Sequence, residues 1–265
     1  MHRQGDRKLI DPRAVIDPDA ELEEGVSVGP FSVIGAGVKI GRGTEIGPHV
    51  VIKGPTRIGR DNRIFQFASV GEDPQDKKFA GEPTRLEIGD RNVIREYVSI
   101  NRGTLQHNGG VTRVGDENWI MAHAHIAHDC RVGNRTVFAN GASLAGHVTV
   151  DDCAALGGYA LVHQFCAIGT HAFCAFGSVI NKDVPPFVTV TGNPARSSGL
   201  NTEGLRRHGF PDETRKALRR AYRTLYRSNL SLQAALQRLH DQSRQDEAVA
   251  VLAAFVERAK RGIVR

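Results

Sequence analysis

Aliphatic residues recur at every sixth position along most of the chain. The series keeps one phase over residues 10–70, returns over 88–100, and runs again over 114–180. Glycine directly follows the aliphatic residue in many hexads, as at Val28-Gly29. Because glycine adopts tight-turn conformations without steric cost, each hexad predicts a short strand followed by a turn.

A period of six fits neither an α-helix, whose apolar stripe recurs about every 3.6 residues, nor a flat strand, whose side chains alternate. A triangular prism accommodates it, because three hexads make one coil of about 18 residues with the aliphatic side chains pointing inward. Successive coils would stack about 4.8 Å apart through parallel strand pairing, so residues one coil apart lie above one another. Two insertions, near 72–87 and 106–113, interrupt the repeat.

The pattern therefore predicts a mainly-β fold, a parallel β-helix of hexapeptide repeats. Prisms of this kind are known to coil left-handed, against the usual right-handed rule for parallel crossovers. The hand is taken from that fold family, because the period alone does not determine it.

The composition changes near residue 195. The repeat is expected to stop at Asp183-Val184-Pro185-Pro186, and beyond Pro194 glycine becomes scarce while apolar residues take helical spacing. We therefore divide the chain into a left-handed β-helix domain at 10–194 and a small helical C-terminal domain at 195–265. The helical domain is expected to cover the C-terminal end of the prism.

Three helices are expected in the C-terminal domain, over about 212–228, 231–243 and 246–261. Asp212 and Ser231 stand where side chains cap helix N-termini, and Gly262 lies near the expected end of the last helix.

Charge divides the chain as sharply as composition does. Residues 201–265 contain 14 Lys and Arg against 7 Asp and Glu, while the whole chain carries a net charge of +6. The basic surface either serves solubility or attracts an acidic partner. Nucleic acid is disfavoured as that partner, because only 6% of the residues are aromatic and no nucleic-acid-binding motif is present.

Neither a membrane-spanning segment nor a signal peptide is visible in the sequence. The chain has no run of 18 apolar residues, and its N-terminus lacks a hydrophobic core. We therefore expect a soluble, cytoplasmic protein without stable membrane insertion. The cysteines lack paired Cys-x-x-Cys spacing and are expected to be reduced and structural; they are Cys130, Cys153, Cys166 and Cys174.

Candidate chemistry lies in histidines that the repeat does not need. Five of the 11 histidines fall within three consecutive coils, and none takes the inward position, so they are expected on the outer surface; they are His123, His125, His128, His147 and His163. The stacking rule places His128, Gly146 and Gln164 in one column and His147 over Asp129. One strip of surface would thus hold a titratable base, a bare backbone and an amide.

This set of groups is suited to acyl transfer to a hydroxyl. The imidazole of His128 is the expected general base, because it can take the hydroxyl proton as the oxygen attacks. The backbone N–H of Gly146 is the expected donor to the oxyanion, since glycine lets a carbonyl approach closely. Asp129 is expected to orient the imidazole, which requires a bend in the chain, because neighbours on a strand point opposite ways.

Five segments then resemble one family, the UDP-N-acetylglucosamine O-acyltransferases that begin lipid A synthesis. The resemblance covers roughly residues 10–265, with both insertions and the helical tail. The segments are Ile126-Ala127-His128-Asp129-Cys130, Leu144-Ala145-Gly146-His147-Val148, Val162-His163-Gln164-Phe165-Cys166, Gly81-Glu82-Pro83-Thr84-Arg85 and Glu203-Gly204-Leu205-Arg206-Arg207.

The resemblance implies transfer of an (R)-3-hydroxyacyl chain from acyl carrier protein to the 3-hydroxyl of UDP-N-acetylglucosamine, without a cofactor or metal. It implies a homotrimer with active sites between adjacent prisms, and an acidic carrier protein that the basic tail would attract. His128, Asp129 and Gly146 keep the catalytic roles given above. The substrate-binding residues that it implies are Gln75, Asp76, Lys78, His125, His147, His163, Gln164, Asn201, Glu203 and Arg207.

The sequence departs from its relatives at four positions. Asn101 stands where relatives often have histidine and is left out of the site, while His123 replaces a common asparagine. His208 replaces an arginine of some relatives, so one contact to phosphate or uracil is expected to be weaker or pH-sensitive. Phe176 replaces a glycine in the acyl-chain ruler, which leads us to expect a preferred acyl chain shorter than fourteen carbons, unless the ring packs against a neighbouring subunit.

Three other functions stay open on the sequence. In a zinc carbonic anhydrase of the same prism fold, His123 and His128 would be two ligands, but no histidine between His49 and His107 supplies the third. An acetyl-CoA-dependent hexapeptide acetyltransferase is disfavoured by the long insertion and the Arg-rich tail. A non-catalytic scaffold is disfavoured by the histidine column.

Overall fold

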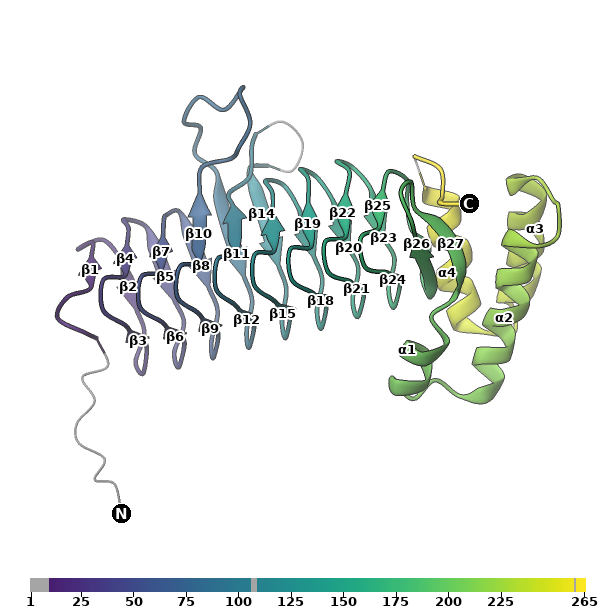
Figure 1. The fold of residues 1–265 in the computed structure, drawn as a ribbon, viewed down its shortest axis with the longest axis horizontal. Coiled ribbons are helices and arrows are strands. Elements are labelled where there is room, and N and C mark those ends of the chain that lie inside the picture. The colour runs from purple at the N-terminus through teal and green to yellow at the C-terminus, as the bar shows by residue number, and fades with distance from the viewer. Residues whose placement is uncertain (1–9, 106–108, 260) are drawn as a thin grey trace, which may run out of the picture.

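The computed structural model describes residues 10–105, 109–259 and 261–265. Three parallel sheets form the faces of a prism, and each is named here by its first strand (Figure 1). The chain visits the β1, β2 and β3 sheets in turn, so consecutive strands in the sequence lie on different faces. The predicted parallel β-helix of hexapeptide repeats is therefore what the chain forms.

The strands of the prism are two to five residues long. The β1 sheet comprises β1 (Val15–Ile16), β4 (Val33–Ile34), β7 (Val51–Ile52), β10 (Ser69–Glu72), β13 (Ser99–Asn101), β16 (His125–Ile126), β19 (Ser143–Leu144), β22 (Leu161–Val162) and β25 (Val179–Ile180). The β2 sheet comprises β2 (Glu21–Leu22), β5 (Val38–Ile40), β8 (Thr56–Ile58), β11 (Arg85–Ile88), β14 (Val111–Val114), β17 (Arg131–Val132), β20 (Thr149–Val150) and β23 (Ala167–Ile168). The β3 sheet comprises β3 (Ser27–Val28), β6 (Glu45–Ile46), β9 (Arg63–Ile64), β12 (Val93–Ile94), β15 (Trp119–Ile120), β18 (Val137–Phe138), β21 (Ala155–Leu156), β24 (Phe173–Cys174), β26 (Val188–Thr191) and β27 (Arg196–Leu200).

Pairing between coils follows the expected register, with Ile126 opposite Leu144, 18 positions on. Both insertions leave the prism at the corner between the β1 and β2 sheets. The first increases the offset between paired residues to 30, at Val70 and Ile100. The second makes the offset 26, at Ile100 and Ile126. From Val28 to Ile180 the aliphatic residues of the repeat are buried and form one continuous core along the prism, whereas Ile10, at its N-terminal end, is 42% exposed.

A ladder of buried asparagines runs along the corner between the β2 and β3 sheets. The Nδ2 of Asn92 donates to Oδ1 of Asn62 at 3.0 Å, and the Nδ2 of Asn118 donates to Oδ1 of Asn92 at 2.9 Å. The same oxygens accept backbone N–H groups of the next coil. The ladder thus satisfies backbone groups that each corner would otherwise leave unpaired.

The prism continues beyond the point where the sequence predicted its end. Strand β26 (Val188–Thr191) pairs in parallel with β24, and β27 (Arg196–Leu200) pairs antiparallel with β26. The prediction of a stop at 183–186 is wrong, because Pro185 and Pro186 occupy a turn and do not end the coil. The division into domains at residue 195 stays a prediction, and β27 lies beyond it while pairing with the prism.

Four helices follow: α1 (Thr202–Arg207), α2 (Asp212–Tyr226), α3 (Leu232–Ser243) and α4 (Glu247–Arg258). Helix α1 was not predicted. Ser231 caps α3 as expected, accepting from the Ala234 N–H at 3.2 Å. The assignment of Asp212 as an N-cap is wrong, because Pro211 holds that position and Asp212 lies in the first turn. Helix α4 is shorter than predicted, ending at Arg258, and Gly262 lies just beyond it with a φ of 67°.

The helices pack at the C-terminal end of the prism (Figure 1). Phe187 of the last coil and Leu205 of α1 join the apolar core of the helices. The Tyr222 hydroxyl lies 2.9 Å from the Ser197 hydroxyl of β27, and the Val264 N–H donates to the Asp183 carbonyl at 2.9 Å. None of the helices in the described ranges has the length and apolar character needed to cross a membrane.

Candidate active site

His128 lies at the corner between the β1 and β2 sheets, in the turn from β16 to β17. Asp129 follows with a φ of 61°, which supplies the bend that the sequence analysis required. The backbone reversal turns the Asp129 side chain to the same side as His128. Both insertions leave the prism at this corner, one and two coils before His128 (Figure 1).

His128 and Asp129 form a hydrogen-bonded pair, with 2.8 Å between Nδ1 and Oδ2. The Asp129 side chain is 0% exposed and that of His128 is 14% exposed. Asp129 also accepts from the Thr104 N–H at 3.0 Å and from the Thr104 hydroxyl at 2.7 Å. Burial opposes ionisation of Asp129, but the hydrogen bonds from His128 and Thr104 outweigh it and lower its pKa. Because an ionised carboxylate only accepts, the neutral form of the His128 imidazole carries its hydrogen on Nδ1 and has its lone pair on Nε2.

Gly146 stands one coil beyond His128, as predicted. A Cβ at this position would lie 2.5 Å from Cε1 and 2.7 Å from Nε2 of the His128 ring, so only glycine fits. Among the described residues, its backbone N–H donates no hydrogen bond. A bare backbone with an available donor therefore faces the basic nitrogen of His128.

Two further histidines surround this pair. His147 lies edge-on to His128, with ring centroids 5.2 Å apart, and its Nε2 is 3.7 Å from Oδ2 of Asp129. The Nδ1 of His125 lies 2.7 Å from the Ser99 hydroxyl. Burial, with the nearby His128, lowers the pKa of His125, so this ring is neutral at neutral pH. Two histidines thus lie near His128, His125 on the same coil and His147 on the next one.

His163 and Gln164 extend the site onto the next coil. Both side chains are exposed, and the His163 Nδ1 lies 3.1 Å from the Gln164 carbonyl oxygen. Phe165 stacks on His147 at 4.5 Å between ring centroids. The predicted column of His128, Gly146 and Gln164 therefore occupies equivalent turns of three successive coils.

The first insertion carries Gln75, Asp76 and Lys78. Gln75 and Lys78 are exposed, and the Lys78 N–H donates to Oδ1 of Asp76 at 3.0 Å. In the part of the chain that the structure describes, no hydrogen bond or ion pair joins them to His128. The second insertion falls partly outside the described residues, which do not include 106–108.

Asn101 and Arg102 fasten the first insertion to the prism. The Nδ2 of Asn101 donates to the Asp73 carbonyl at 2.7 Å. Arg102 donates to the Gly54 carbonyl at 2.7 Å and forms an ion pair with Asp73. Asn101, which was left out of the predicted site, therefore helps to hold the first insertion in place.

The predicted nucleotide-contacting residues lie at a different corner. Asn201 caps α1 by accepting from the Gly204 N–H at 3.0 Å, and its Nδ2 donates to the His171 carbonyl at 3.0 Å. His171 belongs to the corner between the β2 and β3 sheets. Hydrogen bonds from Arg206 and then Arg207 lower the pKa of Glu203 to about 2. Within one chain, this segment therefore lies away from His128.

Phe176 lies at the third corner, between the β3 and β1 sheets. Its side chain is 74% exposed and contacts Tyr159 edge-on at 6.2 Å between ring centroids. His123 lies at the same corner and stacks on Tyr97 at 4.8 Å. His123 and His128, the two ligands of the zinc hypothesis, are thus on different corners of one chain.

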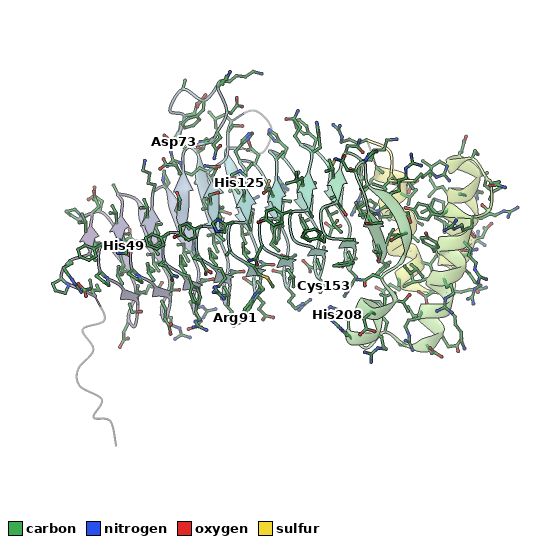
Figure 2. The ribbon with its side chains drawn as sticks, in the orientation of Figure 1. His49, Asp73, Arg91, His125, Cys153 and His208 are labelled. Carbon is green, nitrogen blue, oxygen red and sulfur yellow. The ribbon has the colours of Figure 1, made fainter. Side chains whose placement is uncertain are left out.

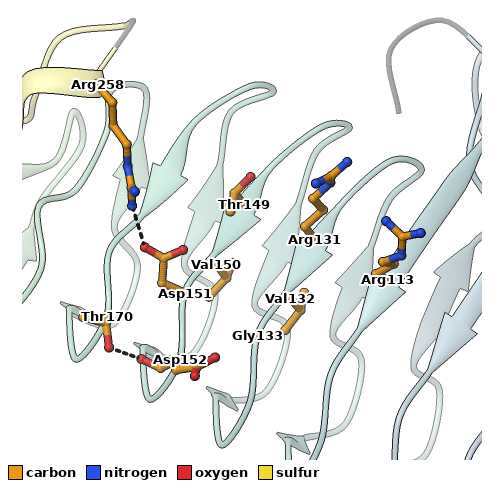
Figure 3. Close-up of a pocket in the computed structure, with 10 residues that line it drawn as sticks. All are labelled: Arg113, Arg131, Val132, Gly133, Thr149, Val150, Asp151, Asp152, Thr170 and Arg258. Atoms are coloured by element: carbon orange, nitrogen blue, oxygen red, sulfur yellow. Dashed lines mark hydrogen bonds and ion pairs between the residues drawn. The ribbon is translucent and has the colours of Figure 1, made fainter. Parts of the chain in front are cut away.

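A groove of about 510 Å³ runs along the β2 sheet and reaches the corner between the β2 and β3 sheets at Gly133, Asp152 and Thr170 (Figure 3). Arg131, two residues after Asp129, lines it together with Arg113 and Arg258 of α4. Arg258 lies 3.4 Å from Oδ2 of Asp151. The groove therefore presents arginines from both the prism and the helical tail.

The four cysteines are free thiols, as predicted. Burial raises the pKa of Cys130 and of Cys174 to about 12 and that of Cys166 to about 11. These three thiols are therefore protonated and inert at neutral pH. Cys153 differs because its side chain is only partly buried.

Two family models match the chain. One, described as UDP-N-acetylglucosamine O-acyltransferase, domain 2, matches residues 183–264, and another, described as bacterial transferase hexapeptide (six repeats), matches residues 112–146. The acyl-[acyl-carrier-protein]–UDP-N-acetylglucosamine O-acyltransferase of Alkalilimnicola ehrlichii is 64% identical over 256 residues, which are 97% of this chain and 99% of that protein. The chain belongs to the UDP-N-acetylglucosamine O-acyltransferase family. The protein of the same name from Thiobacillus denitrificans is 59% identical over 97% of this chain and 99% of its own length.

Solved structures agree with this family. The UDP-N-acetylglucosamine acyltransferase of Francisella novicida superposes with a TM-score of 0.94 at 41% identity, covering 97% of this chain and 94% of that one. The UDP-N-acetylglucosamine O-acyltransferase of Moraxella catarrhalis gives 0.94 at 44% identity, covering 97% and 100%. The predicted left-handed β-helix followed by helices is confirmed, and so is the resemblance drawn from the motifs. The protein is an enzyme of this family, and the zinc-enzyme, acetyl-CoA and scaffold hypotheses are not favoured.

Proposed function

We propose that this enzyme transfers an (R)-3-hydroxyacyl chain from acyl carrier protein to the 3-hydroxyl of UDP-N-acetylglucosamine, as the first step of lipid A biosynthesis. The names of its relatives specify an acyl-carrier-protein donor and UDP-N-acetylglucosamine. One observation carries the assignment of residues, namely the His128–Asp129 pair facing the bare backbone of Gly146.

The pair performs the proton transfers. As the sugar oxygen attacks the thioester carbon, Nε2 of His128 takes the hydroxyl proton, and buried Asp129 stabilises the imidazolium that forms. The carbonyl oxygen becomes an oxyanion that accepts a hydrogen bond from the Gly146 N–H. Collapse of the intermediate breaks the carbon–sulfur bond, and the carrier thiolate takes the proton back from His128. The proton returns within one cycle, so no cofactor is consumed.

The complete site is formed between copies of the chain. The segment with Asn201, Glu203 and Arg207 lies at a different corner from His128, so a neighbouring prism is the source of these residues. An exposed aromatic column at the third corner supports such packing, because large exposed apolar surfaces mark contact sites. Its rings stack at 4.8–5.2 Å and belong to Phe31, His49, Phe67, Tyr97 and His123. The family expectation of a homotrimer accounts for both features.

The acyl donor approaches along the groove on the β2 sheet. Three arginines, Arg113, Arg131 and Arg258, line the groove against two aspartates, a positive balance suited to an acidic carrier protein. Arg131 follows Asp129 by two residues on the same coil, so a carrier in the groove lies next to the coil that bears His128. Arg258 thus gives the basic tail a role in binding the acyl carrier protein.

The reaction is tested with the purified protein, UDP-N-acetylglucosamine and 3-hydroxyacyl carrier proteins of ten, twelve and fourteen carbons. Mass spectrometry should detect 3-O-acylated sugar nucleotide. Donors shorter than fourteen carbons should be preferred, because the exposed Phe176 ring, at the acyl-chain ruler position, would shorten the space for the acyl chain where a neighbouring prism packs. Phe176→Gly should shift the preference toward the fourteen-carbon donor. Absence of product from every donor would contradict the proposed reaction, and unchanged preference in Phe176→Gly would contradict only the ruler.

A further inference from the structure

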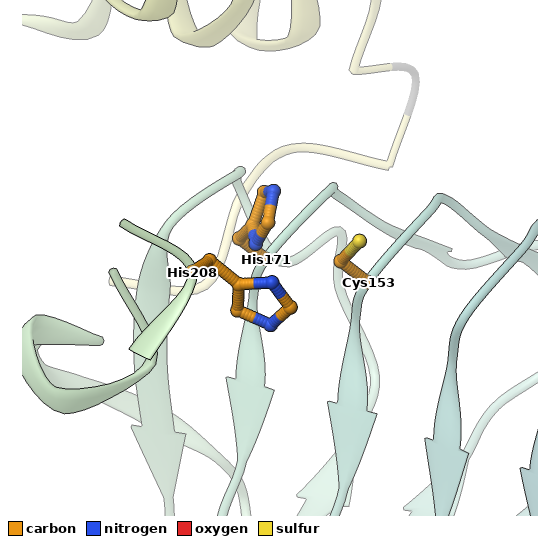
Figure 4. A group of neighbouring side chains, drawn as sticks. All are labelled: Cys153, His171 and His208. Atoms are coloured by element: carbon orange, nitrogen blue, oxygen red, sulfur yellow. The ribbon is translucent and has the colours of Figure 1, made fainter. Parts of the chain in front are cut away.

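A second group of metal-ligating side chains, which includes Cys153 and His208 (Figure 2), lies away from His128, at the corner between the β2 and β3 sheets. Cys153 and His171 occupy equivalent turns of successive coils, with φ angles of 58° and 54°. His208 is the C-cap residue of α1. One ligand atom from each of the three side chains lies within 4.8 Å of the other two. Figure 4 shows these side chains converging from the two coils and the chain after α1.

Aromatic neighbours hold the His171 ring in place. It packs edge-on against His208 and Phe210, with centroids 4.7 Å and 4.9 Å apart, and stacks on Phe187 at 6.0 Å. The Asn201 side chain fixes the backbone there by donating to the His171 carbonyl. The ring is therefore preorganised before any ligand binds.

The Nδ1 of His171 is buried and has no hydrogen-bond partner among the described residues. Native structures rarely leave such a nitrogen unsatisfied. Burial, together with the nearby His208 and Arg135, lowers the pKa of His171 to about 4. Imidazole nitrogens are common metal ligands, so a bound cation would give this nitrogen a partner.

A charged side chain lies beside the Cys153 thiol. A hydrogen bond to Cys153 is the main cause of the raised pKa of Arg135. Arg135 is exposed, so its side chain can move away from Cys153 when a cation enters.

We propose that Cys153, His171 and His208 form a binding site for a transition-metal ion of borderline softness, with Zn²⁺ as its main ligand. One thiolate and two imidazoles suit zinc, whereas magnesium and calcium require oxygen ligands. His208 is exposed, so a fourth position is open to solvent or to a substrate group. This site goes beyond the proposed acyl transfer, which uses no metal.

Occupancy of the site would fasten α1 to the prism. Cys153 and His171 belong to the coils, while His208 follows Arg207 directly. A metal bridging them would fix the segment that carries Glu203 and Arg207. Metal binding and order in the proposed nucleotide-contacting segment are therefore coupled.

The test uses the full-length protein, stripped with a chelator and titrated with Co²⁺ and then Zn²⁺. We expect about one Co²⁺ per chain with a thiolate-to-cobalt charge-transfer band, which Zn²⁺ abolishes by displacement. Cys153→Ser should remove the band. His208→Asn should weaken metal binding by more than roughly 100-fold. Loss of a residue that only orients a metal ligand already costs roughly 10-fold to 100-fold. His240→Asn, a histidine on α3 outside the cluster, should bind like the wild type.

Three results would overturn the proposal. One is the absence of a charge-transfer band. Another is a band that persists in Cys153→Ser, which would place the metal elsewhere. The third is unchanged affinity in His208→Asn, which would remove His208 from the site. Far-UV circular dichroism of each stripped variant verifies folding, and none of these readouts depends on acyl transfer.

Discussion

A single missing Cβ at Gly146 allows the His128 imidazole to occupy its position. Gly146→Ala should lower kcat by about 10²-fold or more, because the new methyl group displaces the ring and blocks the oxyanion donor. Steady-state kinetics and far-UV circular dichroism would check this. Gly35→Ala is the matched control, since its Cβ would meet no described atom closer than 3.4 Å and should leave both properties unchanged. A fully active Gly146→Ala would refute the assigned geometry.

Asp129 links the site to stability. Its pKa is lowered in the folded chain, so the unfolded chain takes up the proton at higher pH and acidification favours unfolding. This contribution is complete above the ordinary Asp pKa of about 3.9 and is lost as pH falls through the lower folded value. Asp129→Asn should therefore melt below the wild type at neutral pH, with a difference that shrinks on acidification below about pH 3.9. Thermal unfolding across pH measures it, and a pH-independent difference would be inconsistent with an ionised buried Asp129.

The sequence alone could predict that His128 and Gly146 lie together, but not the hydrogen bonds that hold the neighbouring Asp129 and His125 in place. His128 and Gly146 are one uninterrupted coil apart, so the repeat places them together. Thr104 contacts Asp129 across an offset of 25 residues, and Ser99 contacts His125 across 26. The second insertion sets these offsets. Its sequence does not show how many of its residues leave the coil, so the pairing of residues across it could not be predicted.

At the scale of elements, the asparagine ladder holds one corner of the prism together. Asn92→Ala should destabilise the protein by about 1–3 kcal/mol, because the buried Asn118 N–H loses its acceptor and the Gly115 carbonyl loses its donor. Chemical denaturation would measure the change. Lys39→Ala, which breaks an exposed ion pair with Glu21, should cost no more than about 0.5 kcal/mol. Equal effects of the two substitutions would contradict a structural role of the ladder.

The groove on the β2 sheet makes a separate prediction for α4. Arg258→Glu should raise the KM for the acyl carrier protein several-fold, because it places a negative charge where an acidic carrier approaches. The KM for UDP-N-acetylglucosamine should not change. Arg238→Glu makes the same charge change at an exposed position of α3 and serves as the control. Equal carrier KM values for both variants would remove the groove as the docking surface.

Two elements escaped prediction for physical reasons. Helix α1 has six residues and buries only Leu205, so it has no apolar periodicity to detect. Strand β26 follows two prolines, which the sequence analysis took as the end of the repeat. Long helices and repeated coils could be predicted because their patterns extend over many residues.

At the scale of the whole molecule, the proposed sharing of the site between subunits of a trimer predicts complementation. Trimers of His128→Ala alone or of Arg207→Ala alone should each lose activity. Trimers that contain both variants should regain about one third of wild-type activity, because one of their three interfaces pairs an intact His128 with an intact Arg207. Co-expression with two affinity tags and assay of doubly purified protein would measure this. A mixture as inactive as the homotrimers would indicate that both residues act within one chain.

The most direct test of the account is acyl transfer by His128→Ala beside the wild type and His240→Ala. Single-turnover assays with 3-hydroxyacyl carrier protein and UDP-N-acetylglucosamine would isolate the chemical step. The account predicts product from the wild type and His240→Ala, and a rate lower by about 10²–10⁴-fold in a folded His128→Ala. Product formed at the wild-type rate by His128→Ala would contradict it.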